Sequence, residues 1–84
     1  MNFRFSKHAE NELVLRQIPR EFVETVLREP QQIAPERPPK KAYQSKIDFG
    51  GRVFLLRVIV DDTVEPVTIV TVYRTKKINK YWKP

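Results

Sequence analysis

The sequence predicts an α+β domain in which an N-terminal two-helix hairpin packs on one face of a twisted antiparallel β-meander. Two observations support this class: apolar residues recur at helical spacing as far as residue 29, and apolar and polar residues alternate between residues 42 and 74. Because 84 residues can bury only one modest core, we expect a single domain over residues 1–84. Its expected parts are helices at about 7–17 and 19–29, strands at about 42–49, 52–61 and 67–74, and a basic, aromatic C-terminal tail at 75–84.

The first predicted helix follows Ser6, whose hydroxyl can cap the free backbone N–H groups of the first turn. Ala9 and Leu13 fall on one stripe of this helix and are expected to face the core. A second helix should follow almost at once, because Pro19 suits a position in its first turn. The two helices are therefore expected to form a tight hairpin.

The second predicted helix carries an apolar stripe along one side. Glu21 and Glu24 lie near its positive N-terminal end, and Pro30 stops it. The stripe that we expect to be buried consists of Ile18, Phe22, Val23, Val26 and Leu27.

Three prolines lie in residues 31–41, so this stretch is expected to be an extended connection. Three antiparallel strands should follow it, the first two joined by a turn at Gly50 and Gly51. That turn pairs Phe49 with Arg52 and defines two sides of the sheet. The side expected to face the core carries Tyr43, Ser45, Ile47, Phe54, Leu56 and Val58. The other side carries Gln44, Lys46, Asp48, Val53, Leu55 and Arg57 and should face solvent or a ligand.

The position of the third strand depends on the turn after Asp61. A turn with an even number of residues puts Val67, Ile69, Thr71 and Tyr73 on the core side. Lys46, Arg57 and Arg74 then share the open side of the sheet. A slip of one residue would put Tyr73, and not Arg74, on that side.

Positive charge is concentrated in two blocks of a chain whose formal net charge is +6. Residues 37–60 contain six basic residues and one acidic residue, and residues 74–84 contain five basic residues and no acidic one. Clustered cations create a positive potential that attracts a polyanion such as nucleic acid. Nucleic-acid binding is therefore favoured, although many small basic proteins do not bind nucleic acid.

Several kinds of site are excluded or not expected. The chain has no cysteine and a single histidine, so it offers no disulfide or thiolate metal site, and we expect neither a metal nor a cofactor. The first dozen residues contain no apolar run typical of a signal peptide, and Arg57 interrupts the most apolar segment, VFLLRVIV. We therefore expect a cytoplasmic protein that does not contact a membrane.

Arg57 is the most informative residue, because a guanidinium in an apolar central strand must be paired or solvated. A structural explanation is a salt bridge to Asp48 or to a helix glutamate, or a side chain that reaches to water. The functional explanation is that the rigid strand presents a permanently charged fork to phosphate. The sequence leaves both open.

His8 is the one side chain that can exchange a proton near neutral pH without a large pKa shift. It starts a row with Glu12 and Arg16 along the first helix, at spacing i, i+4 and i+8. The row is either a solvated helix surface or part of a catalytic site in which Arg16 contacts nucleic acid.

The C-terminal tail contains Lys76, Lys77, Lys80, Tyr81 and Trp82. Its lysines can follow phosphates while the two aromatic rings offer faces for base stacking, as in proteins that bind single strands. The alternative is that Ile78 and Trp82 pack against the sheet and the lysines only keep the protein soluble. Both can hold at once.

Four segments, FSKHA, LRQIP, FVETVLREP and VTVY, resemble those of a small prokaryotic domain family of unknown function. The resemblance covers roughly Phe5 to Tyr73 and includes the family's helix-opening His-Ala pair. Members often have a small residue, commonly Gly, where this chain has Gln17. The family is grouped with the RelE, BrnT, barnase and colicin nucleases, which implies a RelE-like fold and ribonuclease activity.

RelE-type toxins cleave messenger RNA without a metal, usually on the ribosome, and a small antitoxin silences them. Their working residues are similar in position to Lys46, Arg57, Arg74 and Tyr81 here, and His8 matches the family's own histidine. Attack by a ribose 2′-hydroxyl on the adjacent phosphorus needs a proton acceptor, a proton donor and cations near the phosphate. Arginines can supply the cations, and His8, Lys46 and Tyr81 are the candidates for proton transfer.

The sequence therefore predicts a toxin-like endoribonuclease of a type II toxin–antitoxin system, with RNA and a small antitoxin as partners. The alternative is a non-catalytic module of the same fold that binds RNA or another protein. The distance between the candidate residues separates the two hypotheses. A nuclease needs its proton-transfer groups and cations close to one phosphate, whereas a binder tolerates dispersed charge.

Overall fold

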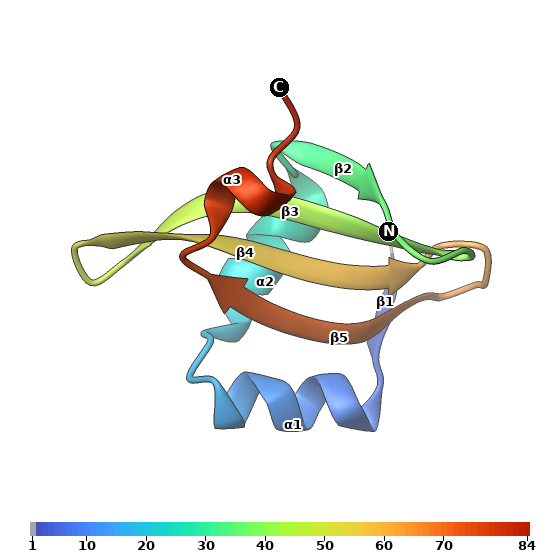
Figure 1. Cartoon of the computed structure of the whole chain (residues 1–84). Coiled ribbons are helices and arrows are strands. Elements are labelled where there is room, and N and C mark those ends of the chain that lie inside the picture. The colour runs from blue at the N-terminus through green and yellow to red at the C-terminus, as the bar shows by residue number, and fades with distance from the viewer. Residues whose placement is uncertain (1) are drawn as a thin grey trace.

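The computed structural model describes residues 2–84 and contains one five-stranded sheet and three short helices. The elements in chain order are β1 (Phe3–Phe5), α1 (Lys7–Leu15), α2 (Arg20–Arg28), β2 (Gln32–Pro35), β3 (Lys40–Phe49), β4 (Arg52–Asp61), β5 (Val67–Thr75) and α3 (Ile78–Tyr81). The strand order across the sheet is β1-β5-β4-β3-β2 (Figure 1). β1 runs parallel to β5, and the other neighbouring strands are antiparallel. None of the helices in the described part of the chain has the length and apolar character needed to cross a membrane.

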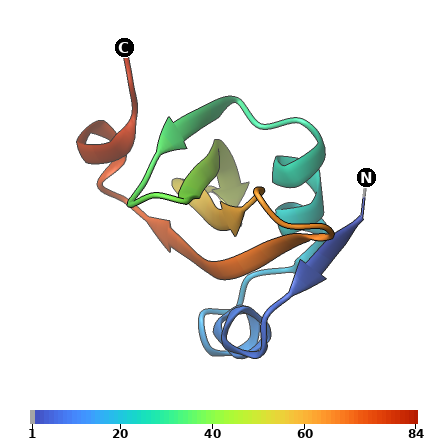
Figure 2. The same ribbon diagram turned by 90° about the vertical axis from the view of Figure 1, so that its right-hand side faces the viewer.

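The predicted two-helix hairpin on a three-stranded meander is wrong. The chain begins with β1, which adds a parallel edge strand beside β5, and β2 forms inside the stretch expected to be a plain connection. α1 packs on β5 and β1, whereas α2 packs on β3 and β4 (Figures 1 and 2). The two helices therefore lie against different parts of a sheet that dominates the fold.

The ends of α1 follow from local chemistry. Ser6 caps the helix as predicted, since its hydroxyl accepts a hydrogen bond from the backbone N–H of Ala9 at 3.0 Å. The helix ends at Leu15 and not at residue 17, because Gln17 adopts a left-handed φ of 53°. The N–H groups of Gln17 and Ile18 then bond back to the carbonyls of Val14 and Leu13, which is the Schellman arrangement of helix C-termini. A glycine suits this conformation best, which gives a physical reason for the small residue common in the similar family.

The sheet separates two unequal layers, which we call the helix face and the tail face. The helix face carries Leu56, Val58 and Val60 of β4, and these side chains pack with the buried stripes of α1 and α2. The predicted stripe of α2 is confirmed, because Val23, Val26 and Leu27 are buried there. On the tail face, α3 and the C-terminal tail cross the sheet on the side opposite α2 (Figure 2). This second layer contains a much smaller apolar cluster of Ala34, Ala42 and Ile59, with Tyr73 packed against it.

The predicted register of the first hairpin is confirmed by the pairs Phe49 with Arg52 and Tyr43 with Val58. The third strand follows the prediction only as far as Ile69, which pairs with Val60. Its next partner pair is Thr71 with Ile59, so Val70 is an extra residue in a β-bulge. Beyond the bulge every side chain of β5 lies on the face opposite to the predicted one.

The bulge is stabilised by the connection between β1 and α1. The backbone N–H of Ser6 donates to the carbonyl of Ile69 at 3.0 Å, and the Ser6 hydroxyl donates to the carbonyl of Val70, also at 3.0 Å. A single serine therefore caps α1 and donates to two backbone carbonyls at the bulge.

Candidate functional site

The tail face brings together polar residues from β3, β4, β5 and the C-terminal tail. Arg57 is at its centre and is only 3% exposed. Its Nε donates to Gln44 Oε1 at 2.8 Å, its Nη2 donates to Glu36 Oε2 at 3.1 Å, and its Nη1 donates to the Tyr73 hydroxyl. The ring of Tyr81 covers the guanidinium, with 4.2 Å between the ring centroid and Cζ. We call these five residues the Arg57 cluster.

This geometry favours the structural explanation of Arg57. Each guanidinium nitrogen has a partner, and the salt bridge is to Glu36 in the loop between β2 and β3, not to Asp48 or a helix glutamate. A guanidinium in this environment has no free fork for a phosphate. Arg57 therefore orders Tyr73 and Tyr81 and does not itself present charge to solvent.

The two tyrosines of the cluster differ in their acidity. The pKa of Tyr81 lies below its ordinary value of 10.0, mainly because the hydroxyl of Tyr73 acts as a hydrogen-bond partner, with Lys80 and Arg57 adding to the effect. Burial is the main reason that the pKa of Tyr73 lies above the ordinary value. Tyr81 is consequently the phenol of this pair that loses its proton first, and its ring lies at the edge of the cluster where solvent reaches it.

His8 lies at the rim of the same face. Its Nε2 is 3.1 Å from Thr71 Oγ1, and Thr71 lies two residues before Tyr73 on β5. Because a strand rises about 3.3 Å per residue, the Cα atoms of Thr71 and Tyr73 are about 7 Å apart. Glu12 does not pair with His8, since its carboxylate accepts from Nε of Arg16 at 2.8 Å. The imidazole is exposed and has no carboxylate partner among the hydrogen bonds of the described residues.

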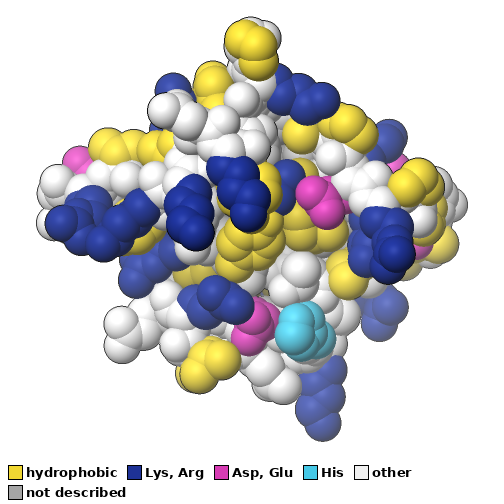
Figure 3. Space-filling model, in the orientation of Figure 1, with side chains coloured by type: hydrophobic (Ala, Val, Ile, Leu, Met, Phe, Trp, Pro, Cys, Tyr) yellow, Lys and Arg dark blue, Asp and Glu magenta, His cyan; other side chains and the backbone are white. Residues whose placement is uncertain are grey.

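Lysines dominate the part of the tail face nearest α3. A hollow of about 590 Å³ is lined by Lys46, Lys76, Lys77, Ile78, Asn79 and Lys80. No carboxylate is among these lining residues, so their ammonium charges add. Figure 3, which views the tail face, shows several Lys and Arg side chains across this side, with the single histidine of the chain below the middle of the view. Nζ of Lys46 also lies 4.2 Å from the ring centroid of Trp82, so one face of that indole is already covered.

Arg74 does not belong to this site, and the prediction that it shares the open side with Lys46 and Arg57 is wrong. It pairs with Leu56 and therefore lies on the helix face. Its guanidinium carbon lies 4.5 Å from the ring centroid of Phe49 and 4.9 Å from that of Phe54. The β-bulge at Val70 is the cause, because it exchanges the sides of every later residue of β5 and puts Tyr73 opposite Arg57.

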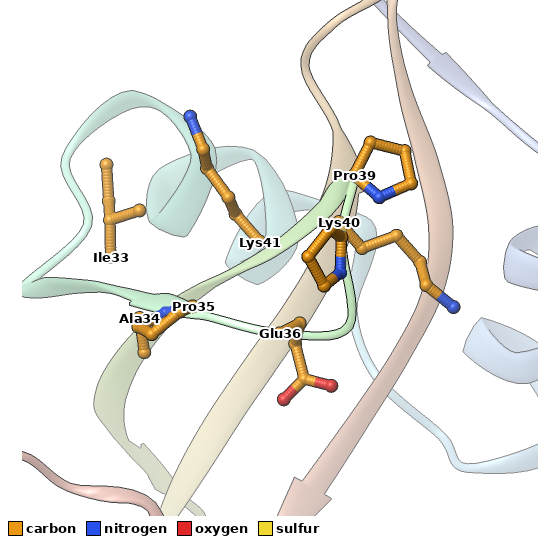
Figure 4. Close-up of a pocket in the computed structure, with 8 residues that line it drawn as sticks. Ile33, Ala34, Pro35, Glu36, Pro39, Lys40 and Lys41 are labelled. Atoms are coloured by element: carbon orange, nitrogen blue, oxygen red, sulfur yellow. The ribbon is translucent and has the colours of Figure 1, made fainter.

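A second hollow, of about 450 Å³, lies along the loop between β2 and β3 (Figure 4). It is lined by Ile33, Ala34, Pro35, Glu36, Pro38, Pro39, Lys40 and Lys41. The Glu36 carboxylate is engaged by Arg57, and the Lys41 ammonium lies 3.0 Å from Asp62 Oδ2. This hollow is therefore mainly apolar and touches the Arg57 cluster only through Glu36.

The sequence predicted Lys46, Arg57 and Arg74 on the open side of the sheet and named His8 and Tyr81 as further site candidates. The structure has Lys46, Arg57 and Tyr81 on the tail face, His8 at its rim and Arg74 on the opposite face. The sequence analysis did not identify three residues of the Arg57 cluster. These residues are Gln44, Glu36 and Tyr73, none of which was predicted to take part in a site. Two signals pointed to them: Gln44 is the register partner of Arg57, and Tyr73 was the residue expected on this face after a one-residue slip. Nothing in the sequence indicated Glu36, which is twenty-one residues from Arg57.

A protein-family model described as a domain of unknown function, DUF4258, matches residues 5–74. The match covers most of the chain, and the protein belongs to this family. No curated protein and no solved structure matches the chain.

Proposed function

We propose that this member of the DUF4258 family is a metal-independent endoribonuclease that cleaves RNA by attack of a 2′-hydroxyl, similar to toxins of the RelE and BrnT type. The observation that carries the proposal is the position of Tyr81, a phenol held over a buried guanidinium beside a lysine-lined hollow. Such a phenol ionises more readily than an ordinary tyrosine. A proton acceptor and a set of cations therefore lie on one side of the sheet.

Lysines hold the RNA in this proposal. Lys46, Lys76, Lys77 and Lys80 neutralise neighbouring phosphates, and each such contact releases a condensed counterion. Arg16, at the end of the His8 row, pairs with Glu12, so in the free protein its charge is offset by that carboxylate. Trp82 has one ring face covered by Lys46, so base stacking falls mainly to its other face.

Proton transfer is assigned to side chains of the same face. The Tyr81 phenolate accepts the proton of the 2′-hydroxyl while the 2′-oxygen forms a bond to phosphorus and the bond from phosphorus to the 5′-oxygen breaks. The ammonium of Lys46 or Lys80 donates a proton to the departing 5′-oxygen and stabilises the charge on the phosphate. The products are a 2′,3′-cyclic phosphate and a 5′-hydroxyl end. His8, at the rim, exchanges protons with water or with the neighbouring nucleotide.

Arg57 acts in this scheme through Tyr81 and not on the substrate. Its permanent charge beneath the ring favours the phenolate, and its hydrogen bond to Tyr73 orients the hydroxyl that lowers the pKa of Tyr81. Arg74 has no catalytic role here, because it lies on the opposite face of the sheet.

The expected partners are RNA, with messenger RNA on the ribosome as one form of the substrate, and a small acidic antitoxin. An acidic polypeptide can cover the lysines of the tail face and exclude RNA by charge complementarity. This part of the proposal is supported by the net charge of +6 and by the lysines that line the hollow beside α3.

The test is cleavage of a defined RNA by the purified protein in the presence of a chelator. We expect cleavage that stops when the scissile ribose carries a 2′-methoxy group, and that falls on the order of 100-fold in Tyr81→Phe with little change in RNA binding. Tyr43→Phe is the matched control, since Tyr43 lies on the helix face with its hydroxyl near Asp62. A strict requirement for magnesium, or equal losses in the two variants, would refute the mechanism.

A non-catalytic RNA-binding module is the second candidate, and one observation favours it. Every nitrogen of the central guanidinium is already bonded within the protein, so Arg57 is not free to clamp a scissile phosphate. Salt-dependent RNA binding without cleavage, and without an effect of induced expression on growth or transcript integrity, would establish this candidate instead.

A further inference from the structure

Gln44 is a fully buried polar side chain in the middle of β3, with an exposed fraction of 0%. Its Oε1 accepts from Nε of Arg57 at 2.8 Å. Its Nε2 donates to Gln32 Oε1 at 2.8 Å and to the backbone carbonyl of Tyr81 at 3.1 Å. The orientation of the amide is fixed by chemistry, because Arg57 can only donate and a carbonyl can only accept.

Gln32 continues this network to the last residues of the chain. Its Nε2 donates to the backbone carbonyl of Lys83 at 2.7 Å, and its Oε1 accepts from the backbone N–H of Lys83 at 3.1 Å. This reciprocal pair of bonds is what a neighbouring β-strand would offer to an extended residue. Two glutamine side chains therefore bond to three backbone groups of the C-terminal tail.

Gln44 contacts both Tyr81, the proposed base, and Arg57, the cation beneath its ring. One side of its amide holds the guanidinium of Arg57, and the other side holds the backbone of Tyr81. The distance of 4.2 Å between that guanidinium and the Tyr81 ring is therefore set by a third residue that touches neither solvent nor substrate. α3 is a single helical turn of four residues and has no buried residue of its own, so its position depends on these hydrogen bonds and on the ring contacts of Tyr81 and Trp82.

We infer that Gln44, supported by Gln32, is the positioning residue of the site: the two amides clamp the C-terminal tail so that Tyr81 stays over Arg57. This inference rests on the proposed function for its catalytic consequence. The clamp itself is a statement about geometry, and it can be tested without any cleavage assay.

Gln44→Glu keeps the hydrogen bond to Arg57 and removes the hydrogen bonds that hold the tail. A carboxylate still accepts from Arg57, but it cannot donate to Gln32 or to the carbonyl of Tyr81, so the tail loses its buried anchor. Gln32→Ala removes the outer half and leaves the contacts of Gln44 with Arg57 and Tyr81. Gln31→Ala is the matched control. Gln31 is the neighbouring glutamine, and its side chain accepts from the backbone N–H of Lys46 on β3 and makes no bond to the tail.

Trp82 is the only tryptophan and lies next to the clamped residues, so its fluorescence reports on the tail. In Gln44→Glu and Gln32→Ala we expect stronger quenching of Trp82 fluorescence by acrylamide and an emission maximum closer to that of a free indole. The β-sheet signal in circular dichroism should be unchanged. The lowest tyrosine pKa, measured by absorbance, should rise toward the ordinary value because Tyr81 leaves Tyr73 and Arg57. Gln31→Ala should match the wild type in both measurements.

Unchanged quenching and an unchanged tyrosine titration in a folded Gln44→Glu protein would overturn the clamp. If Gln44→Glu does not fold, Gln32→Ala decides by the same two measurements. Where the wild type cleaves RNA, the clamp variants should lose on the order of 100-fold in rate, and the rising limb of the pH profile should move to higher pH. A wild type that cleaves no RNA would refute the proposed function and leave the fluorescence test of the clamp fully valid.

Discussion

On the helix face of the sheet, the apolar residues of α1 and α2 cover a continuous set of apolar side chains, whereas on the tail face a short C-terminal segment covers a buried arginine and a buried glutamine. Each face carries an arginine over aromatic rings, but the environments differ. Arg74 lies over Phe49 and Phe54 and has no salt bridge among the described residues, whereas Arg57 is almost completely enclosed and each of its guanidinium nitrogens has a hydrogen-bond partner.

The two faces differ in what each contributes to the folded protein. Apolar packing has no preferred direction, so the helix face tolerates small adjustments of its side chains. A buried polar network requires a partner for every donor and acceptor, and none of the buried side-chain polar atoms in residues 2–84 lacks one. We therefore expect the helix face to supply most of the free energy of folding and the tail face to supply the specific geometry.

Leu55 and Leu56 give the sharpest test of this comparison, because they are adjacent on β4, equally buried at 0% exposure, and point to opposite faces. Leu56→Ala should lower the free energy of unfolding by about 3 to 5 kcal/mol, since it leaves a cavity between the sheet and both helices. Leu55→Ala should cost about 2 kcal/mol, because the tail that covers this side can settle into the space. Urea unfolding measures both. Equal losses would contradict the view that the tail face is the thinner layer.

Arg57→Ala should rank next, at about 2 kcal/mol in the free energy of unfolding. The change leaves the buried Oε1 of Gln44 without a donor and removes the cation beneath the ring of Tyr81. The double variant Arg57→Met with Gln44→Leu replaces both partners by apolar groups of similar size and should lose less stability than the sum of the single changes. Additive losses would show that the two residues do not form one network.

Arg74→Ala should have a smaller effect on stability, about 0.5 to 1 kcal/mol, because a cation over an aromatic ring near solvent contributes only this much. It should also leave RNA cleavage unchanged, since Arg74 lies on the face opposite Tyr81. Chemical denaturation and the chelator-resistant cleavage assay measure the two outcomes. A loss of cleavage with unchanged stability would mean that RNA reaches the helix face.

Much of the local structure was predictable because it depends on residues that are close together in the sequence. The cap at Ser6, the stripe of α2 and the register around Gly50 and Gly51 all follow from neighbouring residues. β1 and β2 were missed because three or four residues are too few to establish a period of two. These edge strands are stable only because a neighbouring strand is already in place.

The arrangement of the site was harder to predict, for a physical reason that β5 illustrates. Its segment VTIVTVY has β-branched apolar residues on both alternating sides, so the pattern gives no indication of the extra residue at Val70. The residue bonded to the bulge, Ser6, lies sixty-four residues away in the sequence. The need for a partner to Arg57 was apparent from the sequence, but the identity of that partner, Glu36, depends on how a proline-rich loop folds.

Tyr73→Phe tests the electrostatic link between the two tyrosines of the tail face with little change in shape. The variant removes the hydroxyl that lowers the pKa of Tyr81, so the first tyrosine to ionise should do so at a higher pH, closer to 10.0. The folded-state pKa of Tyr81 is lower than its unfolded value, so this coupling adds its full stability above the unfolded pKa and loses it as the pH falls through the folded pKa. Near neutral pH the variant should therefore lose only the hydrogen bond to Arg57, about 1 kcal/mol.

Absorbance titration of the tyrosinate band measures this change, with Tyr43→Phe as the control. Burial and the neighbouring Asp62 raise the pKa of Tyr43, so removing this phenol deletes a late phase of the titration and leaves the first phase in place. If Tyr81 is also the base for RNA cleavage, the rising limb of the pH profile should move with the first phase in Tyr73→Phe and stay in Tyr43→Phe. If the first titration phase does not move in Tyr73→Phe, the two tyrosines are not coupled. If that phase moves but the pH profile of the cleavage rate does not, Tyr81 is not the base in the chemical step.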